Sequence, residues 1–263
     1  MPENLRDVYL GMRNRNHDGY EMEVIEYDTY DNIKVRFLPP YEGILKAKMG
    51  SFKNGEIHNP FAPTVSGYGI KGIKYSTRDE KDTNKHGIEY LTWVNMLRRS
   101  VDKKYENKFP SYKEVKCDPR WQYYENFYEW MREQENFQQL KQQNDVNLDK
   151  DILVKGNKLY SPETCALVPR RVNNLLLKSD AIRGQYPMGV KYYPRNKKYG
   201  AVEGSRENSR FLGLCDTVEE AFMKYKIAKE QRIKDVAKEE YEKGNITKKC
   251  YDALMNYTVE ITD

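Results

Sequence analysis

Alternating apolar and polar positions predict short β-strands in the first quarter of the chain. Residues 21–27 and 32–37 alternate on either side of a polar turn, and residues 45–52 are expected to pair again before an Asn-Gly turn. The charged segment 76–87 has no apolar period and predicts a linker. We therefore expect residues 1–75 to form a small all-β module, a barrel or a curled sheet, without catalytic groups.

A helical period replaces this alternation in residues 88–140. One stripe begins at Tyr90 and ends at Val101, and a second runs from Trp121 to Met131. Aromatic residues dominate both stripes, and packing into a core is their simplest explanation. The amide-rich segment 134–147 is expected to loop back to the next element.

The last eighty residues predict the order β-β-β-α-α. Three alternating segments are expected to form an antiparallel sheet: residues 188–193, 197–203 and 210–214. Thr217 and Glu220 form a capping box before a long apolar-periodic helix, in which Arg232 is the odd member of the apolar face. A Gly-Asn pair ends that helix, and residues 247–257 predict a shorter final one.

These patterns together indicate an α+β, multi-module protein. The expected parts are an all-β module (1–75), a linker (76–87), a helical region with a ββα hairpin-helix (88–180) and a three-stranded antiparallel sheet with a packed helix (184–263). The chain has 263 residues, of which 32% are charged, and this composition favours small cores over one large core.

Charge adds information mainly through its distribution. The net charge is +5, but residues 166–200 hold eight basic residues against one acid, which places a positive field in the C-terminal half. The four cysteines contain no CxxC pair, so a structural zinc site is not expected, and free cysteines suit a reducing compartment. The N-terminus lacks an apolar segment and no run reaches membrane-spanning length, so we expect a cytoplasmic protein without membrane contact.

The segment 148–175 holds the candidate chemistry. Metal-dependent phosphodiester cleavage needs a divalent ion with oxygen ligands near the phosphate and a base that activates water. A hairpin joined to a helix can supply these groups from Asp149, Lys150 and Asp151 on the strand side and Asn173 on the helix. Asp149 and Asn173 are the candidate ligands for Mg²⁺ or Mn²⁺, and the adjacent Arg170 and Arg171 are expected to contact phosphate.

Two family resemblances follow from the order of these residues. The run from Trp93 through Cys117, Trp121, Asp149, Tyr160-Ser-Pro-Glu-Thr-Cys165 and Asn173-Asn174 resembles HNH-type homing endonuclease-like proteins of bacteriophages. The later run Gly189-Val-Lys-Tyr, Lys198-Tyr-Gly-Ala201 and Leu212-Gly-Leu-Cys-Asp-Thr-Val-Glu-Glu-Ala221, with Tyr225, resembles the ethylene-response-factor (APETALA-type) DNA-binding domain. The resemblances cover about residues 88–240 and imply a site-directed DNA endonuclease, encoded by a phage and acting in the cytoplasm of a bacterial host.

One position departs from the HNH pattern. The family carries a histidine as general base beside the first acid, whereas this chain has Lys150, which is protonated at neutral pH unless strongly desolvated. Asp151 is an alternative base or ligand. The hairpin is therefore either catalytic or a degenerate scaffold, and a purely structural role without nucleic acid is the third alternative.

The C-terminal sheet is the predicted DNA-contacting element, with its helix on the opposite face. Besides Arg170 and Arg171, the candidate DNA-binding residues are Lys191, Tyr193, Arg195, Lys197, Lys198, Tyr199 and Arg210. Lys197 and Lys198, near a hairpin turn, are expected to contact the backbone rather than bases. Each strand lysine has the alternative of lying on a solvated sheet face.

Three functions remain open from the sequence. The first is a monomeric, double-stranded-DNA endonuclease that nicks or cleaves with Mg²⁺ or Mn²⁺. The second is a DNA-binding regulator that does not cut. The third is a phage inhibitor that blocks a host nucleoprotein system, with the N-terminal module contacting a host protein.

Overall fold

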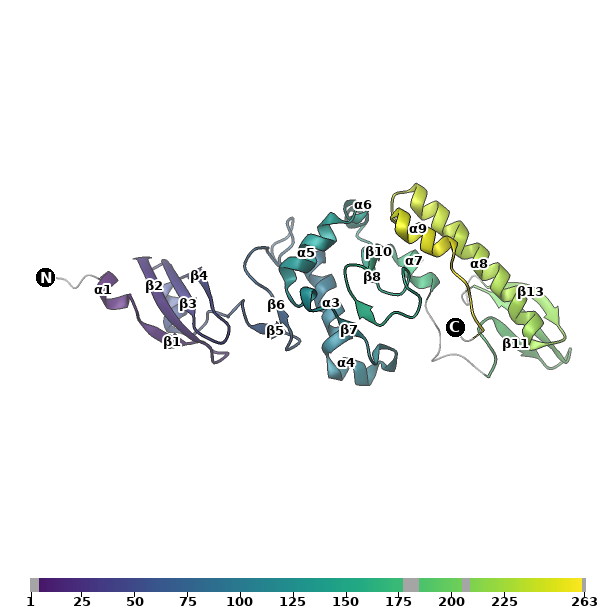
Figure 1. Ribbon diagram of the computed structural model, residues 1–263, viewed down its shortest axis with the longest axis horizontal. Coiled ribbons are helices and arrows are strands. Elements are labelled where there is room, and N and C mark those ends of the chain that lie inside the picture. Colours follow the sequence, from purple (N-terminus) through teal and green to yellow (C-terminus); the bar gives the residue numbers. More distant parts are fainter. Residues whose placement is uncertain (1–4, 177–184, 205–208, 262–263) are drawn as a thin grey trace. The chain divides into compact units, whose positions relative to one another are not determined.

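The computed structural model describes residues 5–176, 185–204 and 209–261 (Figure 1). The chain is a mixture of helices and antiparallel sheets and divides into two compact units, Met1–Trp130 and Met131–Asp263. The predicted boundary at 180–184 lies outside the described residues, as do Lys178, Asp180, Arg183 and Glu207.

The first unit begins with a four-stranded antiparallel sheet in the order β1-β2-β3-β4. Its elements are α1 (Leu5–Tyr9), β1 (Arg13–Arg15), β2 (Glu21–Thr29), β3 (Asn32–Phe37), β4 (Gly43–Ala47) and α2 (Met49–Lys53). Alternate residues of β2 and β3, among them Val24 and Val35, are fully buried on one face. Over the described residues β1 and β4 do not pair with each other, so the module is an open sheet and not the barrel that was the other expectation.

The expectation of one strand over residues 45–52 is wrong in its second half. The chain turns into α2, which buries Met49 and Phe52 against the same core. These two residues are three positions apart, which is a helical spacing that can place both on one face of a single turn.

The remainder of the first unit is mostly helical. Its elements are β5 (Pro63–Val65), β6 (Gly69–Ile70), α3 (Ile88–Val101), α4 (Lys103–Lys108), η1 (Pro110–Tyr112), β7 (Lys116–Cys117), η2 (Pro119–Gln122) and α5 (Tyr124–Glu133), whose end belongs to the second unit. Trp93 and Trp121 are buried, and the indole Nε1 of Trp93 donates to the backbone oxygen of Trp121 at 2.8 Å. The prediction that both aromatic stripes form core is thereby confirmed.

After the end of α5, the second unit continues with α6 (Phe137–Gln142), where a loop was expected. Phe137 and Leu140 are buried three positions apart, and this short apolar pattern was obscured by the surrounding amides. The hairpin-helix follows as β8 (Asn147–Asp149), β9 (Leu159–Tyr160), β10 (Ala166–Val168) and α7 (Arg170–Leu175). β8 pairs antiparallel with β10, with Asp149 opposite Ala166.

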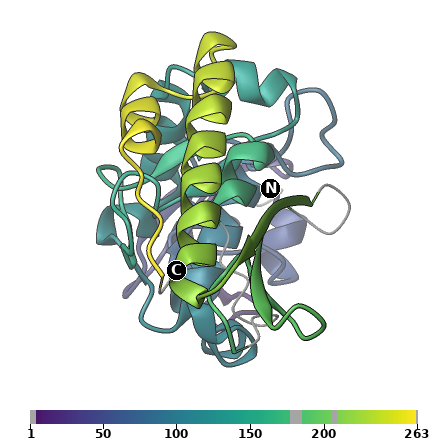
Figure 2. The same cartoon turned by 90° about the vertical axis from the view of Figure 1, so that its right-hand side faces the viewer.

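The C-terminal sheet has the predicted order β11-β12-β13, all antiparallel. The strands are β11 (Val190–Tyr193), β12 (Lys198–Glu203) and β13 (Arg210–Cys215), followed by α8 (Val218–Glu242) and α9 (Lys248–Met255). The Thr217 hydroxyl accepts the N–H of Glu220 at 3.1 Å, which confirms the predicted cap. Figure 2 shows α8 as a long yellow-green helix with the sheet against one half and α9 beside the other.

One hydrophobic core joins the hairpin-helix to the sheet and α8. Val168 and Val172 belong to it, together with Ala201 of β12 and Ile233 of α8. The two segments that the sequence separates into different modules therefore stabilise each other within the second unit.

The described helices include none with the length and apolar character required to cross a lipid bilayer.

Candidate nucleic-acid interface

Asp149 ends β8, and its carboxylate closes the turn that follows. Oδ1 accepts the backbone N–H groups of Asp151, at 2.7 Å, and Ile152, at 2.8 Å. Burial raises the pKa of Asp149, and these two hydrogen bonds oppose that rise. One carboxylate oxygen is thus already committed to holding the local backbone.

Lys150 is bound within the same loop. Its Nζ donates to Oδ2 of Asp151 at 2.6 Å and to the backbone oxygen of Asn157 at 2.8 Å. Asn157 in turn donates from Nδ2 to the backbone oxygens of Lys150 and Leu159. The Lys150 side chain is only 11% exposed. The ammonium group of Lys150 is therefore already bound by oxygen atoms of its own loop.

These contacts occupy some of the oxygen atoms that a Mg²⁺ or Mn²⁺ site at this hairpin would use. Such ions take roughly six oxygen ligands, whereas Asp149 has one oxygen committed and Asp151 is paired with Lys150. Asn173, the other candidate ligand, lies half-buried in α7. Among the described residues, no three His, Cys, Asp or Glu side chains are grouped so as to hold a metal ion.

The two arginines at the start of α7 differ in their surroundings. Nη1 of Arg171 lies 2.6 Å from Oε2 of Glu239 and 3.1 Å from Oε1 of Glu240, so its charge is balanced by α8. The first contact is the main cause of a raised pKa for Arg171. Arg170 is exposed, and its backbone N–H donates to Oδ1 of Asp145. Of the pair, Arg170 is the one that presents its charge to solvent.

The C-terminal sheet has two different faces. Val190 and Ala201 are paired and buried on the face covered by α8. Lys191 and Tyr193 alternate with Val190 and so lie on the opposite face, which we call the open face.

An aromatic pair occupies this open face. The rings of Tyr193 and Phe211 meet edge to face at 5.8 Å, and a Cβ built on Gly200 would lie 2.3 Å from Cε2 of Tyr193 and 3.0 Å from Cε2 of Phe211. Both rings therefore lie over the glycine. Phe211 is 54% exposed, which is high for a phenylalanine. The open face thus combines exposed aromatic surface with the ammonium group of Lys191.

The turn between β11 and β12 adds positive charge at one end. Arg195 and Lys197 are exposed, and Lys197 adopts a positive φ of 53° that closes the turn. Lys198 is paired with Asp216 at 2.9 Å, and this hydrogen bond raises the pKa of Lys198. Lys198 is thus partly neutralised, whereas Arg195 and Lys197 are not held by any described residue.

Two of the predicted DNA-binding residues lie on the face covered by α8. Tyr199 is half-buried and packs against the core, in contact with the rings of Tyr186 and Tyr192. Arg210 stands directly opposite Glu203 in the pairing of β12 with β13. The carboxylate of Glu203 accepts a hydrogen bond from Arg232 of α8, so both strand positions belong to the covered face. The structure therefore brings together Lys191, Tyr193, Arg195 and Lys197, and separates them from Tyr199 and Arg210.

Sequence reasoning missed Phe211 and Gly200. A bulge between Ala201 and Val202 shifts the register, so that Phe211 stands opposite Val202 rather than opposite a residue of the covered face. The signal in the sequence is Gly200, directly after Tyr199 inside the second strand, because a glycine within a strand leaves space for large neighbours.

The chain matches no protein-family model, no curated protein and no solved structure in the comparisons made. The resemblances to HNH-type and ethylene-response-factor proteins therefore stay predictions from the sequence.

Proposed function

We propose that this protein binds double-stranded DNA through the open face of its C-terminal sheet and does not cut it. The observation that carries the proposal is the combination on one uncovered sheet face of Lys191, the aromatic pair Tyr193 and Phe211, and the cationic turn with Arg195 and Lys197. A twisted antiparallel sheet can enter the major groove, with alternate side chains directed at base edges.

The chemistry of the open face suits this partner. Ammonium and guanidinium groups pair with phosphate oxygens and guanine edges, and exposed rings contact thymine methyl groups or sugars. The covered face supplies rigidity, because Ala201 and Val190 pack beneath α8 in the core. We expect the strands to keep their geometry when DNA binds.

The contacts of the hairpin favour binding without cleavage. Asp149 closes a turn, and Lys150 holds Asp151 and Asn157 where an HNH enzyme would place a base and a metal. Nζ of Lys150 is bound by two oxygen atoms of its own loop and is therefore not directed at a water molecule or a phosphate. The endonuclease remains the competing proposal, supported by the family resemblance.

A charge-removal variant tests the DNA interface. Lys191→Gln, Arg195→Gln and Lys197→Asn together remove three cations, and Asn suits the positive φ at position 197. We expect affinity for a duplex oligonucleotide to fall at least about tenfold, and the slope of log K against log salt to decrease by about 3. Fluorescence anisotropy over a salt series measures both.

A matched variant separates the interface from net charge. Lys46→Gln, Lys104→Gln and Lys238→Gln remove the same charge at exposed positions outside the C-terminal sheet. Equal losses in the two triple variants, or no loss in the first, would contradict the proposal.

Supercoiled plasmid with Mg²⁺ or Mn²⁺ distinguishes the two proposals. We expect the intact protein to bind plasmid without producing nicked circles. Nicking that is abolished by Asp149→Asn in a folded, DNA-binding protein would instead establish the endonuclease.

A further inference from the structure

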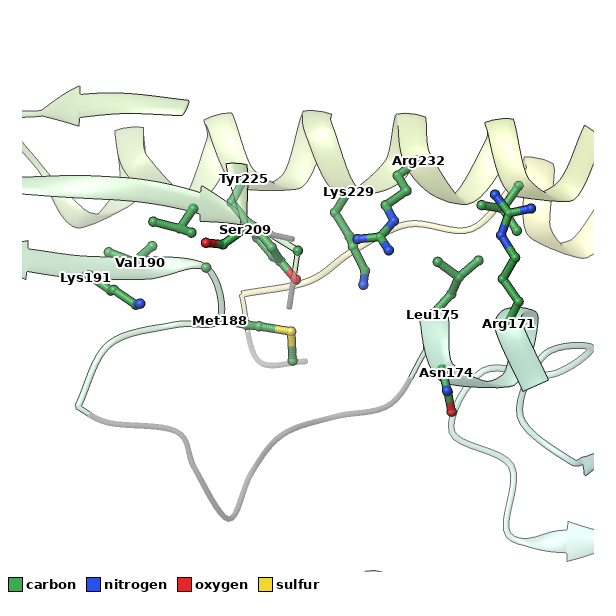
Figure 3. A pocket seen from close by; sticks show the side chains of 14 residues that line it. Arg171, Asn174, Leu175, Met188, Val190, Lys191, Ser209, Tyr225, Lys229 and Arg232 are labelled. Carbon is green, nitrogen blue, oxygen red and sulfur yellow. The ribbon is translucent and has the colours of Figure 1, made fainter. Parts of the chain in front are cut away.

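The second unit contains a pocket between the sheet, α7 and α8. Its volume is about 790 Å³, and its walls come from the end of α7, the start of β11, the end of β12 and the middle of α8. This volume falls within the range of small-molecule sites. Figure 3 shows Lys229 and Arg232 leaving α8 on the same side, toward Met188 and Leu175.

Lys229 is the unusual residue of this pocket. It is half-buried in α8, and no described residue forms a hydrogen bond or ion pair with its ammonium group. Burial lowers the pKa of Lys229, the adjacent Arg232 lowers it further, and Glu203 opposes the change. A partly desolvated cation beside a second cation is unfavourable unless an anion joins them.

Two of the three other cations of the pocket already have partners. Arg232 donates to Glu203 at 2.8 Å, and Arg171 is bound by Glu239 and Glu240. Each guanidinium is therefore balanced by at least one carboxylate, and the charges of Lys229 and of the exposed Lys191 are the excess charge among the described pocket residues. This excess determines the sign of the expected ligand.

The rest of the wall is apolar. Met188, Val190, Leu175 and Val236 line the pocket, together with Tyr225. The Tyr225 ring lies against Gly189, where a Cβ would come within 2.1 Å of Cδ2. A ligand that fits such a pocket has a flat or apolar part beside one anionic group.

We propose that this pocket binds a phosphate-bearing nucleotide, with the phosphate between Lys229 and Arg232 and the remainder of the ligand against Met188 and Tyr225. A phosphate supplies several acceptor oxygens for an ammonium and a guanidinium group at once. The source is either a free mononucleotide or the 5′-phosphate end of a DNA strand. The proposal does not depend on DNA binding by the open face.

Calorimetric titration with dAMP, deoxyadenosine and a single-stranded hexanucleotide with and without a 5′-phosphate tests the pocket. We expect dAMP to bind and deoxyadenosine to bind at least tenfold more weakly. Tighter binding of the 5′-phosphorylated hexanucleotide than of dAMP identifies a strand end as the source, and the reverse order identifies the free nucleotide. No binding by either phosphorylated probe would overturn the proposal.

Lys229→Met keeps most of the length of the side chain and removes the charge. We expect it to weaken dAMP binding at least tenfold, whereas Lys238→Met, on an exposed position of the same helix, has no effect. Unchanged dAMP binding in Lys229→Met would overturn the proposal. Duplex binding by the open face should survive Lys229→Met, and dAMP binding should survive Arg195→Gln with Lys197→Asn, because neither residue lines the pocket, so the two proposals fail separately.

Mild acylation of the unaltered protein provides a readout that needs no variant. A lysine with a lowered pKa is more often unprotonated and reacts first, so we expect Lys229 to be modified early at neutral pH. Saturating dAMP should slow its modification several-fold, as measured by peptide mass spectrometry, and should leave Lys238 unchanged. Equal modification of Lys229 with and without dAMP would contradict the proposed site.

Discussion

At the scale of single residues, Asp149 decides between a structural and a catalytic hairpin. Its Oδ1 accepts two backbone N–H groups, a task that the amide oxygen of asparagine can also perform. We therefore expect Asp149→Asn to keep the fold and Asp149→Ala to lower the free energy of unfolding by about 1–3 kcal/mol, because two N–H groups lose their acceptor. Urea unfolding of both variants measures the difference.

The pH dependence of the same residue has a defined sign. The pKa of Asp149 is raised in the folded protein, chiefly by burial, so ionisation costs more there than in the unfolded chain. Protonated Asp149 contributes to stability below the pKa of 3.8 that it has in the unfolded chain. This contribution is lost as pH rises through the raised pKa of the folded protein. We expect Asp149→Asn to gain stability relative to the unaltered protein between pH 4 and pH 7. A constant difference over that interval would contradict a raised pKa.

Local sequence identified these residues but not their contacts. The acid, the lysine and the asparagine at positions 149, 150 and 157 are visible in the sequence, whereas the direction of each side chain depends on how the loop closes. Lys229 escaped notice for a related reason, since one more lysine on a long charged helix is ordinary. Only the walls contributed by α7 and β11 make its surroundings distinctive.

At the scale of elements, Gly189 fixes how β11 meets α8. It has a φ of 78°, and an added Cβ would lie 2.1 Å from Cδ2 of Tyr225. We expect Gly189→Ala to lower the free energy of unfolding by about 2–4 kcal/mol, the sum of left-handed backbone strain and overpacking. Chemical denaturation measures this loss.

Gly156→Ala provides the matched control for Gly189→Ala. Its φ is 77°, but nothing lies within 4 Å of the added Cβ, so only the backbone strain applies and a loss of about 1–2 kcal/mol is expected. Equal losses at the two glycines would show that the Tyr225 contact has no influence on stability.

Elements with strong periodicity were predictable, and weakly patterned ones were not. The three C-terminal strands and the cap at Thr217 follow from alternation and cap chemistry. α2 and α6 were missed because each buries only two apolar residues, a pattern too short to distinguish a helical turn from a strand or loop.

At the scale of the whole molecule, the partition of the chain depends on contacts distant in sequence. The hairpin-helix and the C-terminal sheet share one core through Val168, Val172, Ala201 and Ile233. Such sharing cannot be read from local patterns, which divide the chain wherever a turn or a charged segment occurs. If DNA binding at the open face is correct, the hairpin-helix would contribute to it by supporting α8, since Arg171 bonds to Glu239 and Glu240.

Two core substitutions test the division into units. Leu97 in the first unit and Ile233 in the second are both fully buried, and replacement of either by alanine is expected to cost about 2–5 kcal/mol. Because each unit has its own core, hydrogen exchange should lose protection within residues 1–130 for Leu97→Ala and within residues 131–263 for Ile233→Ala. Loss of protection spread evenly over the chain in both variants would mean that the units unfold as one. With separate unfolding, duplex binding would survive Leu97→Ala and weaken in Ile233→Ala, which places the DNA-binding activity in the second unit.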